Sequence, residues 1–469
     1  MRVTRGRLLG GAAASALGAA GVYELVDRIG SKPARPAATG TPIEQHVLTG
    51  VRIVDDAGVE VVVPPLHHRV VTASVRADPG RRALRDARAE LERLLAALDA
   101  DYPPTPAGLG VTVAWGLPWF RTALGGALLA KLPRDRRATG TRGRDVLVLE
   151  DAERFPSDPD DTILEANDVA VLLRSDRLEA IEDAHGRLFA GVGRELFRVT
   201  SIRKGFAGGG FDGGTGIPKQ RAVAAGITGA ELIPDGAELF LGFTSTQSHA
   251  LGPPAIANFE TLGYVELGDS RLVGGTHMHL SRIDENLNAW YLNFDHRERL
   301  DTTFRPGLDV PPEQLTVPQG PDDVQTADQL RDDYARHRRI GHSGSLQPAS
   351  RLDRQTVGPD GTVYPKGTAV PHRADFNTLD NPFAWSADPA RDRMSDAPSA
   401  GVHFVIFNPT SDDFRRVRLA MDGVLPDGTE LGFDARSRGQ GFNAILRTTH
   451  RQNFLVPPRG ERSFPLVLP

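Results

Sequence analysis

The sequence contains no cysteine, and this absence excludes several kinds of chemistry. A chain without thiols has no disulfide, no cysteine nucleophile, no thiolate-bound zinc or iron–sulfur cluster, and no haem attached through thioether bonds. Any metal must therefore be held by histidine, carboxylate or another oxygen ligand.

The chain also lacks an excess of positive charge and, beyond its N-terminus, a long apolar run. Its 469 residues carry 55 Lys and Arg against 60 Asp and Glu, a net charge of −5. This balance offers no overall attraction for nucleic acid, and the lack of long apolar runs excludes a multi-span membrane protein. The sequence has neither the G-x-S-x-G motif of serine hydrolases nor the H-E-x-x-H motif of zinc proteases, so it gives no support for either function. With 40% hydrophobic residues, the chain is typical of a folded protein. Its length exceeds that of one usual domain, so we expect two lobes or one long two-part domain.

The first residues predict export. Residues 1–7 hold three arginines, and residues 8–22 form an apolar stretch rich in Ala and Gly. A basic start before such a stretch is typical of a secretory signal. Residues 4–10 are similar to a twin-arginine motif in which Gly6 replaces one arginine, so the twin-arginine export machinery is the expected partner. We expect a signal and linker over 1–41 and an exported protein of the cell envelope or extracellular space; an uncleaved anchor is the alternative.

Residues 42–225 predict a ferredoxin-like unit. Period-two alternation or short apolar runs predict strands, and leucines at helical spacing predict helices. The expected elements are strands at 69–75, 109–115, 145–149, 169–173 and 195–203, a helix over 79–100, and a second helix capped by Ser175. Strand, helix, strand, strand, helix, strand is the order of a ferredoxin-like α+β unit.

Residues 226–469 repeat this order more loosely, with loops through most of 300–400. The expected strands are 237–243, 274–283, 402–407 and 453–456, with one helix carrying Leu287, Trp290, Tyr291 and Phe294 and another near 411–422. The predicted fold class is α+β: two ferredoxin-like units with antiparallel sheets packed together, as in a dimeric α+β barrel.

The order of these landmarks resembles the dye-decolourising (DyP-type) haem peroxidase superfamily over most of residues 60–460. The landmarks are VVVPPLHHRVVTASVRAD at 61–78, GVTVAWGLPWF at 110–120, GGGFDGGTGIP at 208–218, GGT at 274–276, GVHFVIF at 401–407 and FLVPP at 454–458. The resemblance implies haem b in the C-terminal lobe, held by a proximal histidine. It also implies a distal aspartate and arginine that help to split hydrogen peroxide while small organic donors are oxidised.

Within this resemblance, His372 matches the proximal ligand of the iron. It lies in VPHRADFN, where an arginine follows at once and the family's Asn-Pro is displaced to 381–382. The alternative is an exposed histidine in a turn. Asp212 matches the distal acid, although it comes one residue early and Gly213 holds the family's position. The alternative for Asp212 is a cap of the turn before Thr215.

The resemblance places the distal arginine about twenty residues after the histidine, where Arg391 and Arg393 lie in DPARDRMSD. Such a segment is equally typical of a solvated surface loop. Elsewhere, His277 and His279 lie two apart on an expected strand and therefore share a face, as a metal pair would; the alternative is a pair of half-buried histidines.

These observations predict an exported haem b oxidoreductase that uses hydrogen peroxide and small organic donors. Because the distal positions depart from the family's pattern, a haem-binding protein with little activity is an alternative. An envelope protein that uses the same fold without haem is another.

Overall fold

The computed structural model describes residues 41–56, 59–243, 258–308, 310–311, 323–380 and 397–468, with only the backbone described at 59 and 60. The expected signal before Thr41 and the candidates Arg391 and Arg393 lie outside these residues. Within the described ranges, none of the helices combines the length and the hydropathy that a membrane span requires.

The N-terminal unit has the expected ferredoxin-like order. Its elements are β3 (His67–Val75), α3 (Arg81–Asp101), β4 (Gly110–Gly116), β7 (Val169–Ser175), α6 (Leu178–Phe189) and β8 (Phe197–Phe206). The strands lie side by side as β8-β3-β7-β4, all antiparallel. When the strands are numbered in chain order, they lie side by side as 4-1-3-2. Each of the two crossover helices connects two strands that have a third strand between them. The ferredoxin-like order predicted for this unit is confirmed, apart from the strand expected at 145–149.

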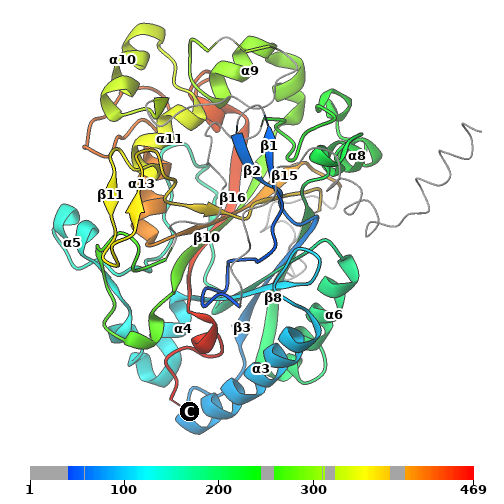
Figure 1. Ribbon diagram of the computed structural model, residues 1–469, viewed down its shortest axis with the longest axis vertical. Helices are drawn as coiled ribbons and strands as arrows, with labels where there is room; N and C mark the ends of the chain where they lie inside the picture. Colours follow the sequence, from blue (N-terminus) through cyan, green and yellow to red (C-terminus); the bar gives the residue numbers. More distant parts are fainter. Residues whose placement is uncertain are drawn as a thin grey trace, which may run out of the picture.

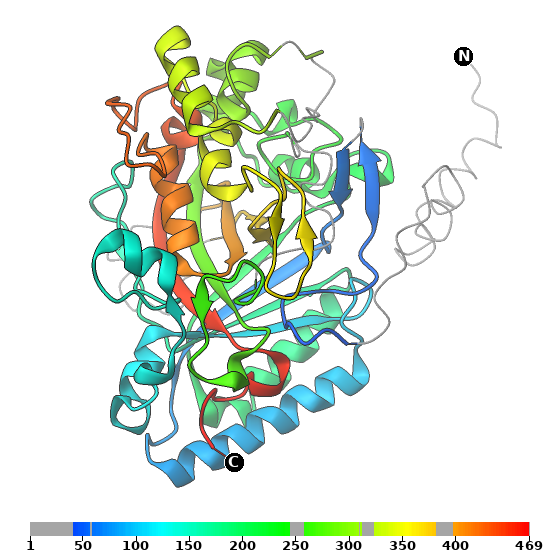
Figure 2. The same cartoon turned by 60° about the vertical axis from the view of Figure 1, so that its left-hand side comes forward.

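The two helices of this unit cover the outer face of its sheet (Figures 1 and 2). One stripe of α3 is apolar because leucines recur at helical spacing, and Leu84, Leu91, Leu95 and Leu98 are buried along it. These side chains pack with Val71, Val113 and Val171 of the strands in one large core. Apolar burial of this kind is the main driving force for folding.

The C-terminal unit repeats the order with more elaborate connections. Its elements are β10 (Thr276–Glu285), α9 (His296–Thr303), α10 (Ala327–His337), α11 (His342–Ser350), β13 (His372–Arg373), β14 (Phe376–Thr378), β15 (Gly401–Asn408), α13 (Ser411–Met421) and β16 (Leu446–Val456). The strand order β16-β10-β15-β14 is again 4-1-3-2.

Two seams join the units into a closed ring. Strand β16 pairs with β4 through Phe454↔Gly116 and Leu455↔Trp115, and β14 pairs with β8 through Asn377↔Phe206. Since β10 pairs with both β15 and β16, the ring has no free edge. Side chains fill the interior of an eight-stranded barrel, and here they are those of Val70, Leu172, Met278, Phe407, Phe454 and their neighbours. The predicted dimeric α+β barrel is confirmed.

Two of the predicted strands are wrong. At 145–149, the structure has only one isolated bridge, Arg134↔Leu147. At 237–243, side chains satisfy the backbone in place of a neighbouring strand: Asn377 Oδ1 accepts a hydrogen bond from the Phe240 N–H at 2.9 Å. The Tyr291 hydroxyl donates to the Phe240 carbonyl at 2.6 Å. Both segments are apolar because they are buried, and burial alone does not distinguish a strand from a loop.

An N-terminal strap, residues 42–56 and 59–65, precedes β3 and includes the hairpin β1 (Ile53–Asp56) and β2 (Val59–Val62). Gln45 fixes its start, since its Nε2 donates to the Pro457 carbonyl at 2.6 Å and its Oε1 accepts from the Val113 N–H at 2.9 Å. The shorter helical elements include α4 (Leu117–Thr122), α5 (Arg136–Arg142), α7 (Gly193–Leu196), η3 (Gly210–Asp212) and α8 (Ile217–Ala224).

Candidate functional site

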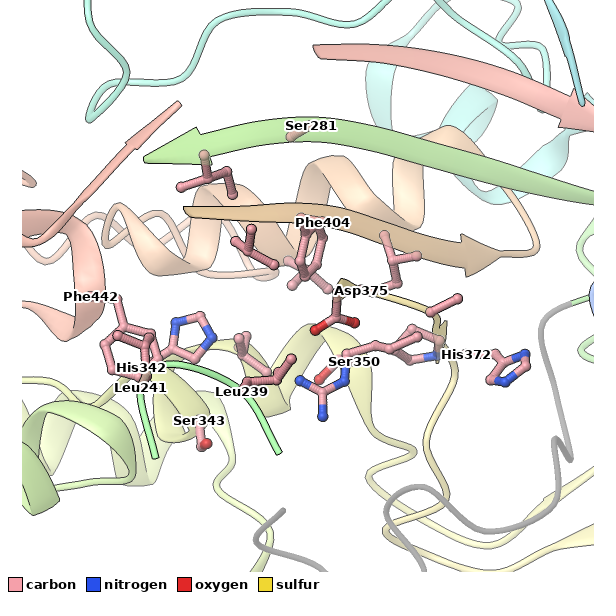
Figure 3. A pocket seen from close by; sticks show the side chains of 18 of the residues that line it. Leu239, Leu241, Ser281, His342, Ser343, Ser350, His372, Asp375, Phe404 and Phe442 are labelled. Carbon is pink, nitrogen blue, oxygen red and sulfur yellow. The ribbon is translucent and has the colours of Figure 1, made fainter. Parts of the chain in front are cut away.

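A cavity of about 360 Å³ lies between the outer face of the C-terminal unit's sheet and the helices α11 and α13, and its lining extends to residues before β3 and to His68 and Arg174 of the N-terminal unit. This volume is in the range of small-molecule sites, roughly 300–1,000 Å³. Figure 3 shows β10 and β15 along one side, with Phe404 reaching into the space, and the labelled residues of α11 on the other. The apolar walls include Leu239, Leu241, Leu346, Phe404, Ile406, Phe414 and Val417.

The cavity exists because the second unit does not fill the space that leucines fill in the first. Helix α11 has nine residues, HSGSLQPAS, and most of its side chains are small. The long leucine-rich α3 occupies the corresponding place in the N-terminal unit. Since protein interiors are normally close-packed, a space of this size lined by apolar groups indicates a ligand site.

His342, the first residue of α11, faces this cavity at one end (Figure 3). Its ring stacks on Phe442, with centroids 4.5 Å apart and planes 29° apart. Burial lowers the pKa of this imidazole to about 3, with smaller contributions from Arg373 and Arg418. Its buried Nδ1 has no hydrogen-bond partner. The imidazole is therefore neutral at physiological pH, the form that binds a metal.

His372, the predicted proximal ligand, lies at the other end of the cavity (Figure 3). It belongs to β13 and pairs with Phe407 of β15, so both side chains share the barrel-facing side of the strands. Its ring lies 5.4 Å from that of His46. Burial lowers its pKa to about 3, and Arg174 and Arg373 add to this effect. The residue is half-buried, so the alternative of an exposed turn histidine is wrong. Its role as a ligand stays a prediction.

Asp212, the predicted distal acid, is the last residue of the short helical turn η3 and lies outside the cavity lining. Its Oδ1 accepts a hydrogen bond from the guanidinium of Arg52 in the strap at 2.6 Å. His372 lines the cavity and Asp212 does not, so the structure does not bring these two predicted residues together in one site. Arg391 and Arg393, the predicted distal arginines, remain untested.

The same glycine-rich loop holds a different acid against the cavity. Glu238 accepts hydrogen bonds from the N–H groups of Gly210 at 2.7 Å and Phe211 at 3.2 Å. Its other oxygen is buried without a partner. Burial raises the pKa of Glu238 to about 7, against the effect of the two N–H donors. A Cβ at Gly210 would lie 2.2 Å from the carbonyl oxygen of Gly236, so only glycine allows this contact.

Three more carboxyl groups line the cavity: Asp158, Glu285 at the end of β10 and Asp375 between β13 and β14. Burial raises the pKa of Glu285 to about 8; Arg282 opposes this shift, and Asp375 adds to it. A carboxyl group that titrates between pH 7 and 8 can both hold and release a proton at neutral pH.

The arginines of the cavity fall into two groups. Arg418 donates to Asp422 at 2.7 Å, and Arg451 donates to Asp158 at 2.6 Å. Arg351, in contrast, has no carboxylate partner among the described residues. Burial lowers its pKa to about 9, and the neighbouring positive charge of Arg373 lowers it further. Unneutralised guanidinium groups at a cavity wall favour an anionic ligand.

His277 and His279 do not form a metal site with a third ligand. His279 bonds through Nδ1 to Asn453 at 2.7 Å and through Nε2 to Ser281 at 2.6 Å, and its ring stacks on Phe414 with centroids 3.5 Å apart. Among the described residues, no three His, Asp or Glu side chains lie close enough to hold a metal ion. Both residues are fully buried, so the alternative of half-buried histidines is not matched either.

Sequence reasoning missed His342 and Glu238. His342 lies in the stretch expected to be loop, and the signal that was available is the pair of glycines around it. A Cβ at Gly341 would lie 2.0 Å from the carbonyl oxygen of Phe304, and one at Gly344 would lie 2.0 Å from Gln325 Oε1. Tightly packed glycines on both sides of a histidine indicate a fixed position for that imidazole. Glu238 carried no local signal, because its partners come from a distant loop.

Comparison with solved structures finds DyP-type peroxidases. The chain resembles the DyP-type peroxidase of Cellulomonas bogoriensis with 18% identity, 92% of this chain and 99% of that chain covered, and a TM-score of 0.46. It resembles a variant of Rhodococcus jostii DypB in complex with haem with 14% identity, coverage of 90% and 98%, and a TM-score of 0.47. It resembles the encapsulated DyP-type peroxidase of Mycobacterium smegmatis with 12% identity, coverage of 86% of this chain and 96% of that chain, and a TM-score of 0.47.

Among curated proteins, none matches the chain. One family model covers residues 65–458, which include the whole barrel and every element around the cavity except the strap. The chain belongs to this family, DUF7405, a family of unknown function.

Proposed function

We propose that the chain is a haem b-binding oxidoreductase that reduces hydrogen peroxide and oxidises small organic donors. The observation that carries the proposal is the composition of the cavity: apolar walls, a neutral imidazole and arginines without carboxylate partners. These groups fit haem b, whose faces are apolar, whose iron takes an imidazole and whose propionates are anionic. Haem, when bound, supplies the redox centre at which peroxide is reduced.

In this proposal the imidazole of His342 would hold the haem iron. Its imidazole is neutral, stacked on Phe442 and placed at the start of a helix whose small side chains leave the space open. His372 packs instead against His46 and Phe407 on the barrel side of β13. The sequence-based assignment to His372 remains a competing prediction, and one experiment tests both.

The chain's own acids would handle the protons. Glu238 holds a buried, unpartnered oxygen against the cavity and titrates near neutral pH, so it serves as the acid–base group. Arg373, on the cavity side of β13, supplies positive charge that stabilises a developing anion. The apolar side chains around them exclude water from the reacting groups.

Titration of the full chain with haem, followed by the Soret band, tests this proposal. We expect His342→Ala to abolish the spectrum of an imidazole-bound haem, and His372→Ala to keep it. His337→Ala, on the exposed side of α10, is the matched control. A His342→Ala protein with the parent's spectrum contradicts the assignment, and loss of the spectrum in His372→Ala would favour the sequence-based prediction.

Peroxide turnover with a dye tests the second half of the proposal. Glu238→Gln should slow turnover by on the order of 10²–10⁴-fold, as expected for a general acid–base residue. Asp212→Asn should slow it far less, because Asp212 pairs with Arg52. The opposite ranking would return the acid–base role to Asp212.

A second candidate function is haem binding without peroxidase turnover. The ion pair between Asp212 and Arg52, which removes the family's distal acid from the cavity, favours it. Haem binding with no turnover in the parent protein selects this candidate. We also propose export, supported by the basic and then apolar N-terminal residues. A reporter enzyme fused after Thr41 tests it, and a reporter retained in the cytoplasm would contradict it.

A further inference from the structure

Arg174, near the C-terminal end of β7, is a buried cation that has no carboxylate partner among the described residues. Its side chain faces the barrel interior, beside His68 of the neighbouring strand, and only 4% of the residue is exposed. One guanidinium nitrogen donates to the carbonyl of His46 at 2.5 Å, while Nε is buried without a partner. Burial lowers its pKa to about 10, and no carboxylate opposes that effect. An unpaired buried charge of this kind is costly unless something compensates it.

Three neutral imidazoles surround this guanidinium, and none of them supplies negative charge. His46 is 1% exposed, and both of its ring nitrogens are unpartnered. Burial and the charge of Arg174 keep the pKa values of His68 and His372 low, at about 3 in both cases. We call Arg174 and these three histidines the Arg174 group. All but His46, which packs directly against His372, line the cavity described above.

The rest of the cavity shows that an arginine here does not have to be unpaired. Arg418 and Arg451 face the same space, and Asp422 and Asp158 neutralise them at 2.7 Å and 2.6 Å. Arg203 is equally buried on the same barrel-facing side and pairs with Glu165. Among the described residues, Arg174 therefore shares the lack of a carboxylate partner with Arg351 of the same cavity, and differs in this from Arg203, Arg418 and Arg451.

Aromatic faces flank the group. The ring of His46 stacks on Phe407, with centroids 4.7 Å apart and planes 28° apart, and His68 stacks on Phe376 at 4.8 Å and 16°. A charged donor between flat apolar faces suits an organic acid, whose carboxylate meets the guanidinium while its body meets the rings.

We propose that the Arg174 group is a binding site for the carboxylate of an organic ligand in the cavity. This carboxylate has two sources: a propionate of a porphyrin that occupies the main cavity, or a separate small aromatic acid. The first source rests on the proposed function, and the second does not. Either one would supply the charge that the protein itself leaves out.

Three probes without iron separate these sources from haem ligation. Protoporphyrin IX carries the two propionates and no metal, and its dimethyl ester carries neither charge; benzoate represents a small aromatic acid. Binding of each to the full chain is measured by fluorescence or calorimetry for the parent, Arg174→Met and Arg174→Lys. A charged hydrogen bond is worth enough to change affinity by roughly 10- to 100-fold.

If the porphyrin is the source, Arg174→Met weakens the binding of protoporphyrin IX by that factor and leaves the binding of the dimethyl ester unchanged. Arg174→Lys then restores part of the lost affinity. If a small acid is the source, Arg174→Met weakens the binding of benzoate and leaves the affinity for protoporphyrin IX unchanged. Equal affinities of parent and Arg174→Met for both acids, or no binding of either to the parent, would overturn the proposal. Because His342→Ala affects only iron ligation, failure of the haem assignment is visible separately.

Stability without ligand gives a second readout. Arg174→Met removes an uncompensated charge, so the melting temperature of the ligand-free protein should stay equal or rise. Arg203→Met, the matched buried control, breaks the pair with Glu165 and should lower it. A fall in the melting temperature of Arg174→Met as large as that of Arg203→Met would show that Arg174 is already compensated within the fold and would overturn the proposal.

Discussion

Glu238 both stabilises the fold and lines the cavity. One carboxyl oxygen accepts hydrogen bonds from the N–H groups of Gly210 and Phe211 in the glycine-rich loop. The other oxygen is buried and accepts no hydrogen bond from the described residues. Burial favours the protonated form, while the two donors favour the charged form. Burial is the larger effect, which raises the pKa to about 7.

We expect this raised pKa to appear in the protein's stability. Between the ordinary value of 4.5 and about 7, the folded protein keeps a proton that the unfolded chain loses. The free energy of unfolding therefore falls as pH rises through this window, by roughly 3 kcal/mol at most. Glu238→Gln keeps an oxygen acceptor for the loop and removes the ionisation, so its stability relative to the parent should grow from pH 4.5 to pH 8.

Urea unfolding at four or five pH values measures this difference. Glu231→Gln, an exposed residue in the following segment, is the control, and its difference from the parent should not change with pH. Parallel curves for the parent and Glu238→Gln would mean that the carboxyl is charged throughout the range. In that case Glu238 would be a structural acceptor only.

At the scale of elements, the sequence predicts regular segments well where one face is apolar. The strands β3, β7, β10 and β15 and the helices α3 and α13 all lie within a few residues of their expected positions. The errors at 145–149 and 237–243 come from buried loops. There the backbone groups bond to partners such as Asn377, which lies 137 residues along the chain from Phe240. Local patterns hold no information about such partners.

The candidate site was harder to predict than the fold for the same reason. His372 was recognisable by the motif around it, whereas the position of His342 depends on how α11 packs against the end of α9. Asp212 was chosen from its loop, but the strap residue Arg52 decides where its carboxylate points. Motifs locate the loop, and long-range contacts determine which side chain reaches the cavity.

Helix α11 gives an element-scale prediction. Gly341→Ala would place a Cβ 2.0 Å from the Phe304 carbonyl oxygen, so α11 must shift or the contact must open. Overpacking of this kind costs roughly 1–3 kcal/mol. Because His342 is the next residue, we expect haem affinity to fall together with the melting temperature.

Gly186→Ala, in the middle of α6, is the matched control. No atom lies within 4 Å of its added Cβ, so this substitution should raise stability by about 0.5–1 kcal/mol and leave haem affinity unchanged. Thermal unfolding and haem titration of the two variants measure both effects. A Gly341→Ala protein with the parent's affinity would contradict the proposal that α11 positions His342 as a ligand.

At the scale of the molecule, the two units share one topology and differ in what fills them. Leucines of α3 and valines of β3 and β4 close the space beneath the helices of the first unit. In the second unit, small side chains on α11 leave that space open. The first unit thus contributes mainly core, the second contributes the site, and the closed barrel holds the two in a fixed relation.

The seams between the units are narrow, and Asn377 lies at the narrower one. Its side chain is buried at the single β14–β8 pairing, where Nδ2 donates to the Phe206 carbonyl at 3.1 Å and Oδ1 accepts from the Phe240 N–H at 2.9 Å. Asn377→Ala leaves both groups buried without partners, which costs roughly 1–3 kcal/mol. We expect a lower melting temperature and faster amide exchange in β8 and β14.

Hydrogen exchange followed by mass spectrometry locates the effect. Exchange should rise at the β14–β8 seam and in 237–243, and stay at the parent's level at the β3–β7 pairing, which runs over seven residue pairs from His67 to Ala73. Asn288→Ala, at an exposed position, should change neither stability nor exchange. Because Glu238 lies two residues from Phe240, loosening this seam should also weaken ligand binding in the cavity. Exchange that rises equally over the whole barrel would instead mean that the ring opens as one cooperative unit.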